Sequence, residues 1–111
     1  MEVLFKKKAL QKRCSAEKER GKWFGKAAKK LGRRIDDLAA AGCLEDMRHL
    51  PGRCHELTGN LAGMLAIDLV GSQRLILEPA DEPIPQKDDG GLDWSRVFRV
   101  RIIRIEEDYH G

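Results

Sequence analysis

Five side chains in this 111-residue sequence could together transfer protons and hold a phosphate group. They are His55, Arg74 and the run Asp108-Tyr109-His110, which precedes the final glycine. Histidine is the side chain best suited to proton transfer near neutral pH, so the two histidines are candidates for an acid and base pair. An arginine guanidinium offers a fixed fork of donors to phosphate oxygens. The residue types therefore predict phosphate chemistry, provided the fold brings these distant positions together.

The C-terminal run at 108–110 follows an apolar segment, Val97 to Ile105, which we expect to be a strand. Residues at a chain end are ordered when an element such as a paired strand ties them down. Apolar and charged residues alternate up to Ile102, but Ile103 is apolar as well, so the parity changes. The sequence therefore predicts a β-bulge or a strong twist near these two isoleucines.

Three further strands are expected in the second half of the chain, because short apolar runs there are bounded by turn residues. They cover 53–57, 64–70 and 73–78. The first carries His55, and Arg74 lies near the start of the third. Gly71-Ser72 has the glycine that a type II′ hairpin turn requires at its first central position.

The first half of the chain favours helices after a short edge strand at 2–5. A short helix is expected from Lys7 to Arg13, and then a longer amphipathic helix with Ser15 as its N-cap. We expect a break near Gly21 that divides this longer helix into two segments, and we expect Gly42 to end it. An apolar stripe recurs along it at steps of three or four residues: Trp23, Ala27, Leu31, Ile35 and Leu38.

The position of Trp23 in that stripe predicts core packing against the sheet, with stacking on a nucleic-acid base as the alternative. A strand, then helices, then antiparallel strands predict an α+β fold. We expect a single domain over residues 1–111, with the N-terminal helices packed on one face of a small antiparallel sheet.

Charge is distributed unevenly along the chain. Residues 1–34 carry 13 Lys and Arg against 3 Asp and Glu, whereas residues 35–111 carry 8 against 15. The basic half is compatible with binding to RNA, with a solvated helix face, or with an acidic protein partner. Residues 79–95 form an acidic, proline-containing loop, which is either a solvated insertion or an arm that shields a basic site or grips a partner.

The sequence also predicts what the chain lacks. No apolar run approaches the roughly 18 residues of a transmembrane helix, so no membrane contact is expected. The widely spaced cysteines form no Cys-x-x-Cys pair, which favours free thiols in the reducing cytoplasm. The spacing of Cys43, His49, Cys54 and His55 fits no zinc-ligand pattern, so neither a metal nor another cofactor is expected.

Four segments together resemble the HigB-like branch of the RelE/ParE superfamily of bacterial toxins, of the plasmid maintenance killer protein type. The segments are Phe5-Lys6-x-Lys8-x-Leu10, Leu50-Pro51 followed by His55-x-Leu57-x-Gly59, Arg74-Leu75-Ile76, and Asp108-Tyr109-His110. The resemblance implies a RelE-like fold. It also implies the toxin of a type II toxin–antitoxin system, a ribosome-dependent mRNA endonuclease restrained by a helix-turn-helix antitoxin.

The resemblance implies catalytic roles for His55, Arg74 and His110. Metal-independent RNA cleavage needs a base for the 2′-hydroxyl, an acid for the leaving 5′-oxygen and a cation for the phosphate. The two histidines are the expected acid and base, in either order. Asp108 and Tyr109 are expected at the RNA, where Tyr109 stacks on a base or donates a hydrogen bond and Asp108 orients a histidine.

Two positions depart from the pattern of these toxins. Thr58, which we expect at the RNA, stands where related toxins commonly have a catalytic lysine, and Val70 stands at another usually basic position. Both departures predict an attenuated nuclease. The alternatives are a catalytically impaired domain that only binds its antitoxin, or a toxin that acts on a protein such as DNA gyrase, as in the ParE branch.

Overall fold

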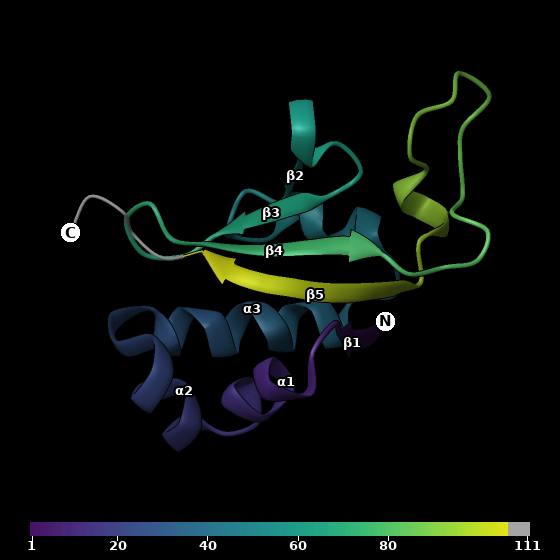
Figure 1. The fold of residues 1–111 in the computed structure, drawn as a ribbon. Helices are drawn as coiled ribbons and strands as arrows, with labels where there is room; N and C mark the ends of the chain where they lie inside the picture. Colours follow the sequence, from purple (N-terminus) through teal and green to yellow (C-terminus); the bar gives the residue numbers. More distant parts are fainter. Residues whose placement is uncertain (107–111) are drawn as a thin grey trace.

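The computed structural model of this protein describes residues 1–106, in which helices cover one side of a five-stranded sheet (Figure 1). The longer elements are β1 (Glu2–Phe5), α1 (Lys8–Cys14), α2 (Glu17–Phe24), α3 (Ala28–Ala40), β2 (His55–Glu56), β3 (Leu65–Asp68), β4 (Arg74–Pro79) and β5 (Arg99–Glu106). Short 3-10 helices are η1 (Gly25–Ala27), η2 (Leu44–His49), η3 (Gly59–Leu61) and η4 (Trp94–Arg96). None of the helices in this part of the chain is long and apolar enough to cross a membrane.

The sheet has the order β1-β5-β4-β3-β2. Strands β2 to β5 pair with antiparallel neighbours, as the sequence predicts, and the α+β fold is confirmed. The first strand differs from that pattern, because β1 pairs in parallel with β5 and makes the sheet mixed. This pairing places the start of the chain beside its last described strand.

The two faces of the sheet have different surroundings. The face toward the helices forms the main core, with Leu75, Leu77 and Ile102 packed against residues of α3 such as Leu31. The opposite face carries a smaller apolar cluster around Ile76. We call this second face the open face, because the helices do not cover it (Figure 1).

The predicted β-bulge in the last strand is confirmed. Ile76 pairs with Arg104 while the next residue, Leu77, pairs with Ile102, so Ile103 is the extra residue. As a result Ile102 belongs to the main core and Ile103 to the cluster on the open face. The bulge also determines which later residues of β5 point to the open face.

The longer helix is broken into two segments, as predicted, but the break lies at Gly25 and not at Gly21. Gly25 has φ +52° and ψ −119°, a conformation that L side chains rarely adopt, and it ends α2. Gly21 remains inside α2. The predicted N-cap was also wrong, since Ala16 caps α2 and the Ser15 hydroxyl donates instead to Lys12 O at 2.7 Å, in the last turn of α1.

Trp23 is 45% exposed, so the prediction that it packs in the core was wrong. The predicted apolar stripe runs from Trp23 across Gly25 to Leu31, but α2 ends before Gly25 and α3 is a separate helix. The face of α3 that packs on the sheet therefore does not continue to Trp23. The Arg13 guanidinium lies 3.9 Å from the centre of the Trp23 ring. The buried tryptophan is Trp94, which is 3% exposed, donates to Glu56 Oε2 at 3.0 Å and has Arg48 over its ring at 3.7 Å.

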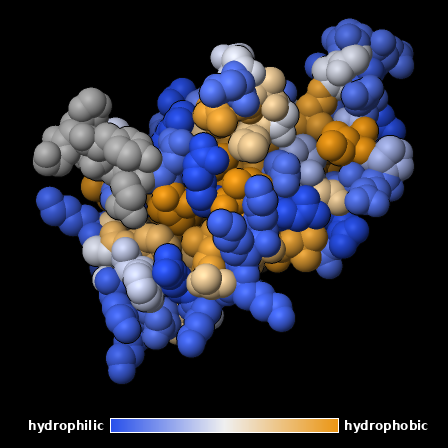
Figure 2. All heavy atoms as spheres, viewed as in Figure 1, coloured by the Kyte–Doolittle hydropathy of each residue, from blue (hydrophilic) through white to orange (hydrophobic). Residues whose placement is uncertain are grey.

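The acidic loop at 79–95 projects from the end of the sheet where β4 ends and β5 begins (Figure 1). The Asp81 carboxylate fastens its base by accepting hydrogen bonds from the Phe98 and Arg99 amides at 3.1 Å. Arg96 ties its far side by donating to Asp93 at 2.8 Å and to Gln86 O at 2.7 Å. Figure 2 shows hydrophilic side chains over the tip of this loop and over α1 and α2, with hydrophobic patches between them.

Candidate active site

Two rows of side chains cross the open face at one end of the sheet. The strand register forms the first row from Asp68, Arg74 and Glu106, which face one another across β3, β4 and β5. It forms the second row, across β2 to β5, from His55, Ala66, Ile76 and Arg104. We call the first set, completed by Arg53 beside Asp68, the outer row. We call the second set the inner row. Both rows follow from the alternation of side chains along a strand.

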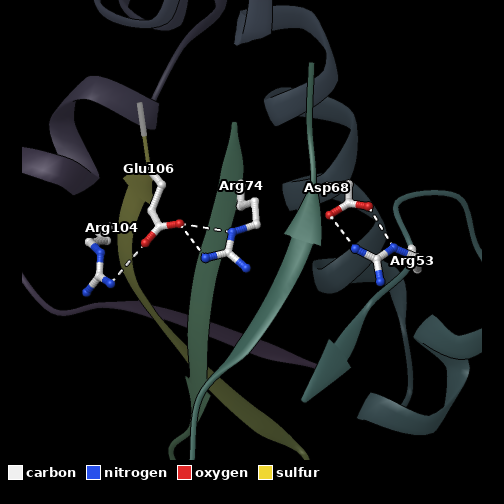
Figure 3. A network of polar contacts seen from close by, with 5 residues as sticks. All are labelled: Arg53, Asp68, Arg74, Arg104 and Glu106. Carbon is white, nitrogen blue, oxygen red and sulfur yellow. Dashed lines mark hydrogen bonds and ion pairs between the residues drawn. The ribbon is translucent and has the colours of Figure 1, made fainter. Parts of the chain in front are cut away.

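Arg74 lies in the outer row and is held by its neighbour in β5. Its Nε and Nη2 atoms donate to Glu106 Oε1 at 2.9 Å and 2.7 Å. Arg104 donates to the other oxygen, Oε2, at 3.1 Å. Figure 3 shows one carboxylate between two guanidinium groups. Arg74 is 30% exposed, and no acceptor for its Nη1 atom is found within residues 1–106. An arginine donor of this kind suits a phosphate oxygen.

Glu106 is less basic than an ordinary glutamate. Burial alone would raise its pKa, but the hydrogen bonds from Arg74 and Arg104, together with the charges of these arginines, lower the pKa below its usual value. The carboxylate is therefore ionised at neutral pH. It occupies the donors that Arg74 would otherwise present to a phosphate group.

Arg53 and Asp68 form the other half of the outer row. The Arg53 Nε and Nη2 atoms donate to the two carboxylate oxygens of Asp68 at 2.9 Å and 3.4 Å. Charges therefore alternate along the row, with Arg74 and Arg53 each next to an acid (Figure 3). The Arg53 side chain is 68% exposed and can leave this pair at little cost.

His55 lies in the inner row, where its backbone pairs with β3. Its Nδ1 atom lies 2.7 Å from Arg53 O, and a carbonyl oxygen can only accept, so Nδ1 carries a proton. In the neutral ring the Nε2 atom is then the unprotonated one and can accept a proton. This hydrogen bond fixes both the tautomer and the direction of the ring, which suits His55 to proton transfer.

His55 and Arg74 lie on the same face with β3 between their strands. Two interstrand spacings of about 4.8 Å and two residue steps of about 3.4 Å put their Cα atoms about 12 Å apart. Both side chains are long enough to reach a group that lies over Asp68, whose side chain is partly exposed between their strands. The structure therefore brings these two predicted catalytic residues to one surface.

Of the other predicted residues, the structure describes only Thr58 and Val70. Asp108, Tyr109 and His110 lie outside the described residues, so their predicted roles stay predictions. Thr58 follows β2 toward the opposite end of the sheet from Arg74, and it precedes η3 as an exposed residue. Val70 lies in the hairpin before Arg74, where its carbonyl accepts from Gln73 N at 3.0 Å.

Neither a reactive thiol next to His55 nor a metal-ligand cluster is found in the described part of this surface. Burial raises the pKa of the Cys54 thiol, next to His55, to about 12 although the charge of Arg48 opposes the shift, so Cys54 stays protonated at neutral pH. Within residues 1–106, no three His, Cys, Asp or Glu side chains are arranged to hold a metal ion. What this part of the chain offers is an oriented histidine and arginine donors.

The sequence interpretation missed four of the residues in the rows: Arg53, Asp68, Arg104 and Glu106. Period-two alternation could have found Asp68, because it shares a strand face with Ala66. Arg53 precedes β2 with φ +49°, so alternation does not place its side chain. Arg104 and Glu106 could be assigned to this face only with the bulge placed at Ile103. Their contact with Arg74 depends on the pairing of β4 with β5, which strand patterns alone do not specify.

We compared the chain with protein-family models, curated proteins and solved structures, and none of them matches it. The resemblance to the HigB-like toxins stays a prediction from the sequence.

Proposed function

We propose that this protein is a metal-independent endoribonuclease, the toxin of a toxin–antitoxin pair that cuts mRNA on the ribosome. The observation that carries the proposal is the shared position of His55 and Arg74 on the open face of the sheet. A histidine of fixed tautomer and a guanidinium within reach of the same group are what RNA cleavage by proton transfer requires.

In the proposed reaction one histidine removes the proton from the 2′-hydroxyl, whose oxygen attacks the adjacent phosphorus. The bond to the 5′-oxygen breaks, and the second histidine supplies a proton to that oxygen. The products are a 2′,3′-cyclic phosphate and a 5′-hydroxyl. Arg74 stabilises the charge that builds up on the phosphate oxygens. His55 and His110 are the proposed pair.

The Arg74–Glu106 contact gives this nuclease an attenuated character. A phosphate group that engages the whole fork of Arg74 has to displace Glu106 from Nε and Nη2. The usually basic positions of the toxin family are Thr58 and Val70 in this chain, so no lysine there compensates. We expect slow cleavage for these two reasons.

The second candidate is a domain that binds a helix-turn-helix antitoxin and cleaves nothing. The same carboxylate favours it, because an arginine that is permanently neutralised by Glu106 contributes little to a transition state. The two candidates differ in the role of Arg74. In the nuclease Arg74 is needed for RNA cleavage, whereas in the binding-only domain it serves the fold alone.

Expression of the chain in a growing bacterial culture, with mapping of message ends inside translated frames, separates the candidates. We expect new ends in wild type and none with Arg74→Ala or His110→Ala. Arg101→Ala is the matched control, because Arg101 is also a β5 arginine, paired with Glu78 at 3.2 Å at the other end of the sheet. Growth arrest without new ends would indicate a protein target, and neither arrest nor ends would indicate the binding-only domain.

A further inference from the structure

A cavity of about 200 Å³ lies between the first half of α3, the loop after η2 and the end of β3. Its charged lining consists of Lys30, Arg34, Arg53 and Asp68, three cations against one carboxylate. Arg53 and Asp68 belong to the outer row as well, so the cavity adjoins the candidate active site.

Arg34 is the buried cation of this cavity. It is 6% exposed, and its Nη1 atom donates to Asp37 Oδ2 at 2.8 Å and to Pro51 O at 3.2 Å. Its Nε atom is buried and has no hydrogen-bond partner among the described residues. Native proteins satisfy nearly all buried polar atoms, because an unpaired one costs free energy. The guanidinium therefore has spare hydrogen-bonding capacity at the wall of a cavity.

The loop over Arg34 is held in an unusual backbone conformation. Gly52 has φ +105° and Arg53 has φ +49°, which is uncommon for a residue other than glycine. A Cβ atom at Gly52 would lie 2.6 Å from Ile67 Cγ2 and 3.1 Å from Arg34 Cδ, so glycine is required for this close approach. The turn brings the Pro51 carbonyl to Arg34 and the Arg53 side chain to the rim. Such conformations persist where the surrounding structure enforces them, often at functional sites.

Lys30 completes the cationic wall from α3. Its side chain is exposed, and none of the described residues pairs with it. Asp68, the one carboxylate of the lining, pairs with Arg53, and Arg34 pairs with Asp37 behind the cavity wall. The cavity therefore carries an excess of positive charge. Lys30 is exposed, Arg34 is buried with an unpaired donor, and Arg53 takes part only in a weak surface ion pair.

We propose that this cavity binds a phosphate group through Lys30, Arg34 and Arg53. The ligand class is a phosphate oxyanion, supplied either as free phosphate or as a phosphate of a nucleotide chain. This proposal does not rest on RNA cleavage, because none of the three cations is a proposed catalytic residue. If the chain also binds RNA, a phosphate in this cavity would lie next to the phosphate at Arg74, because Arg53 belongs both to the cavity and to the outer row.

The arginine Nε–Hε signals in a two-dimensional nitrogen-15 NMR spectrum report on this cavity directly. The full-length Arg74→Ala protein is titrated at constant low ionic strength with inorganic phosphate, and then with a short uncleavable 2′-O-methyl RNA. We expect the Arg34 and Arg53 signals to shift and to saturate. Similar affinity for both ligands identifies free phosphate as sufficient, whereas much tighter binding of the oligonucleotide identifies a nucleic-acid phosphate.

Variants at exposed positions test the assignment without unfolding the protein. We expect Lys30→Ala to weaken binding at least tenfold, and Asp68→Asn to strengthen it several-fold. Lys29→Ala is the matched control, because it removes an exposed lysine from the adjacent position of the same helix and should change affinity less than twofold. Equal losses for the two lysine variants, or Arg34 and Arg53 signals that do not move with either ligand, would overturn the proposal. Cleavage by wild type, whether present or absent, changes neither outcome.

Discussion

Arg74 and Glu106 face each other in β4 and β5, and two nitrogen atoms of the arginine donate to one oxygen of the glutamate. Glu106 thus occupies the Nε and Nη2 donors of Arg74, two of the donors with which the guanidinium could hold a phosphate group. Arg104 donates to the other oxygen and holds the carboxylate in place. A basic surface is in this way kept partly neutral by a residue of its own strand.

Glu106→Gln should increase affinity for nucleic acid. The amide keeps the shape of the side chain but removes the charge that competes for Arg74, so we expect binding of a short uncleavable RNA to tighten several-fold. Fluorescence anisotropy at low salt measures this. Glu78→Gln is the matched control, because Glu78 pairs with Arg101 at the far end of β4. Equal tightening in both variants would show a general charge effect and contradict a specific role for Glu106.

The Glu106 contact should also make stability depend on pH. Because the folded protein lowers the pKa of Glu106, its contribution is fully present above the ordinary pKa of about 4.3 and is lost as pH falls through the lowered value. At neutral pH we expect Glu106→Gln to cost about 1 kcal/mol of unfolding free energy. Urea unfolding of both proteins, from about pH 6 to about pH 3, should show the difference shrinking. A difference that is constant with pH would contradict the assignment.

Gly21 inside α2 and Gly25 directly after it should respond to alanine in opposite ways. Gly25→Ala should destabilise the protein by about 1–2 kcal/mol, because Gly25 has a positive φ. Gly21→Ala should stabilise it by up to about 1 kcal/mol, because Gly21 is helical and a Cβ atom there meets nothing within 4 Å. Denaturant unfolding compares the two. Destabilisation by Gly21→Ala would place the helix break where the sequence interpretation had put it.

The two tryptophans should differ in the same kind of experiment. Trp94→Ala removes a buried ring and its bond to Glu56, so we expect a loss of about 3–5 kcal/mol. Trp23→Ala removes an exposed ring and its contact with Arg13, which is worth about 1 kcal/mol or less. In the single-tryptophan proteins Trp94→Phe and Trp23→Phe, acrylamide should quench Trp23 more strongly than Trp94. Equal quenching would contradict the burial of Trp94.

The sequence was sufficient for the parts of the fold that depend on local periodicity. The change of parity at Ile102-Ile103 correctly predicted the bulge, because side chains on a strand must alternate unless a residue is added. Trp23 shows where periodicity fails, since one apolar spacing continued across Gly25 although the helix axis did not. The sequence alone does not show which of several glycines, such as Gly21 or Gly25, adopts a positive φ and ends the helix.

The candidate site was predicted in part. His55 and Arg74 were chosen for their chemistry, and they share a face because their strands flank β3. The competition of Glu106 for Arg74 could not be predicted, because it arises from the pairing of strands whose register shifts at the bulge. The parallel pairing of β1 with β5 was missed for a related reason, as it joins the two ends of the described chain.

A double-mutant cycle on the first-turnover cleavage of mRNA by ribosome-bound protein tests most directly whether His55 and Arg74 act on one phosphate. His55→Ala, Arg74→Ala and the double variant are compared with wild type. If both residues act on one phosphate, each single variant should lose most of the rate, and the double variant should lose little more than the slower single one. Single variants that cleave at the wild-type rate, or losses that simply multiply, would contradict a shared site.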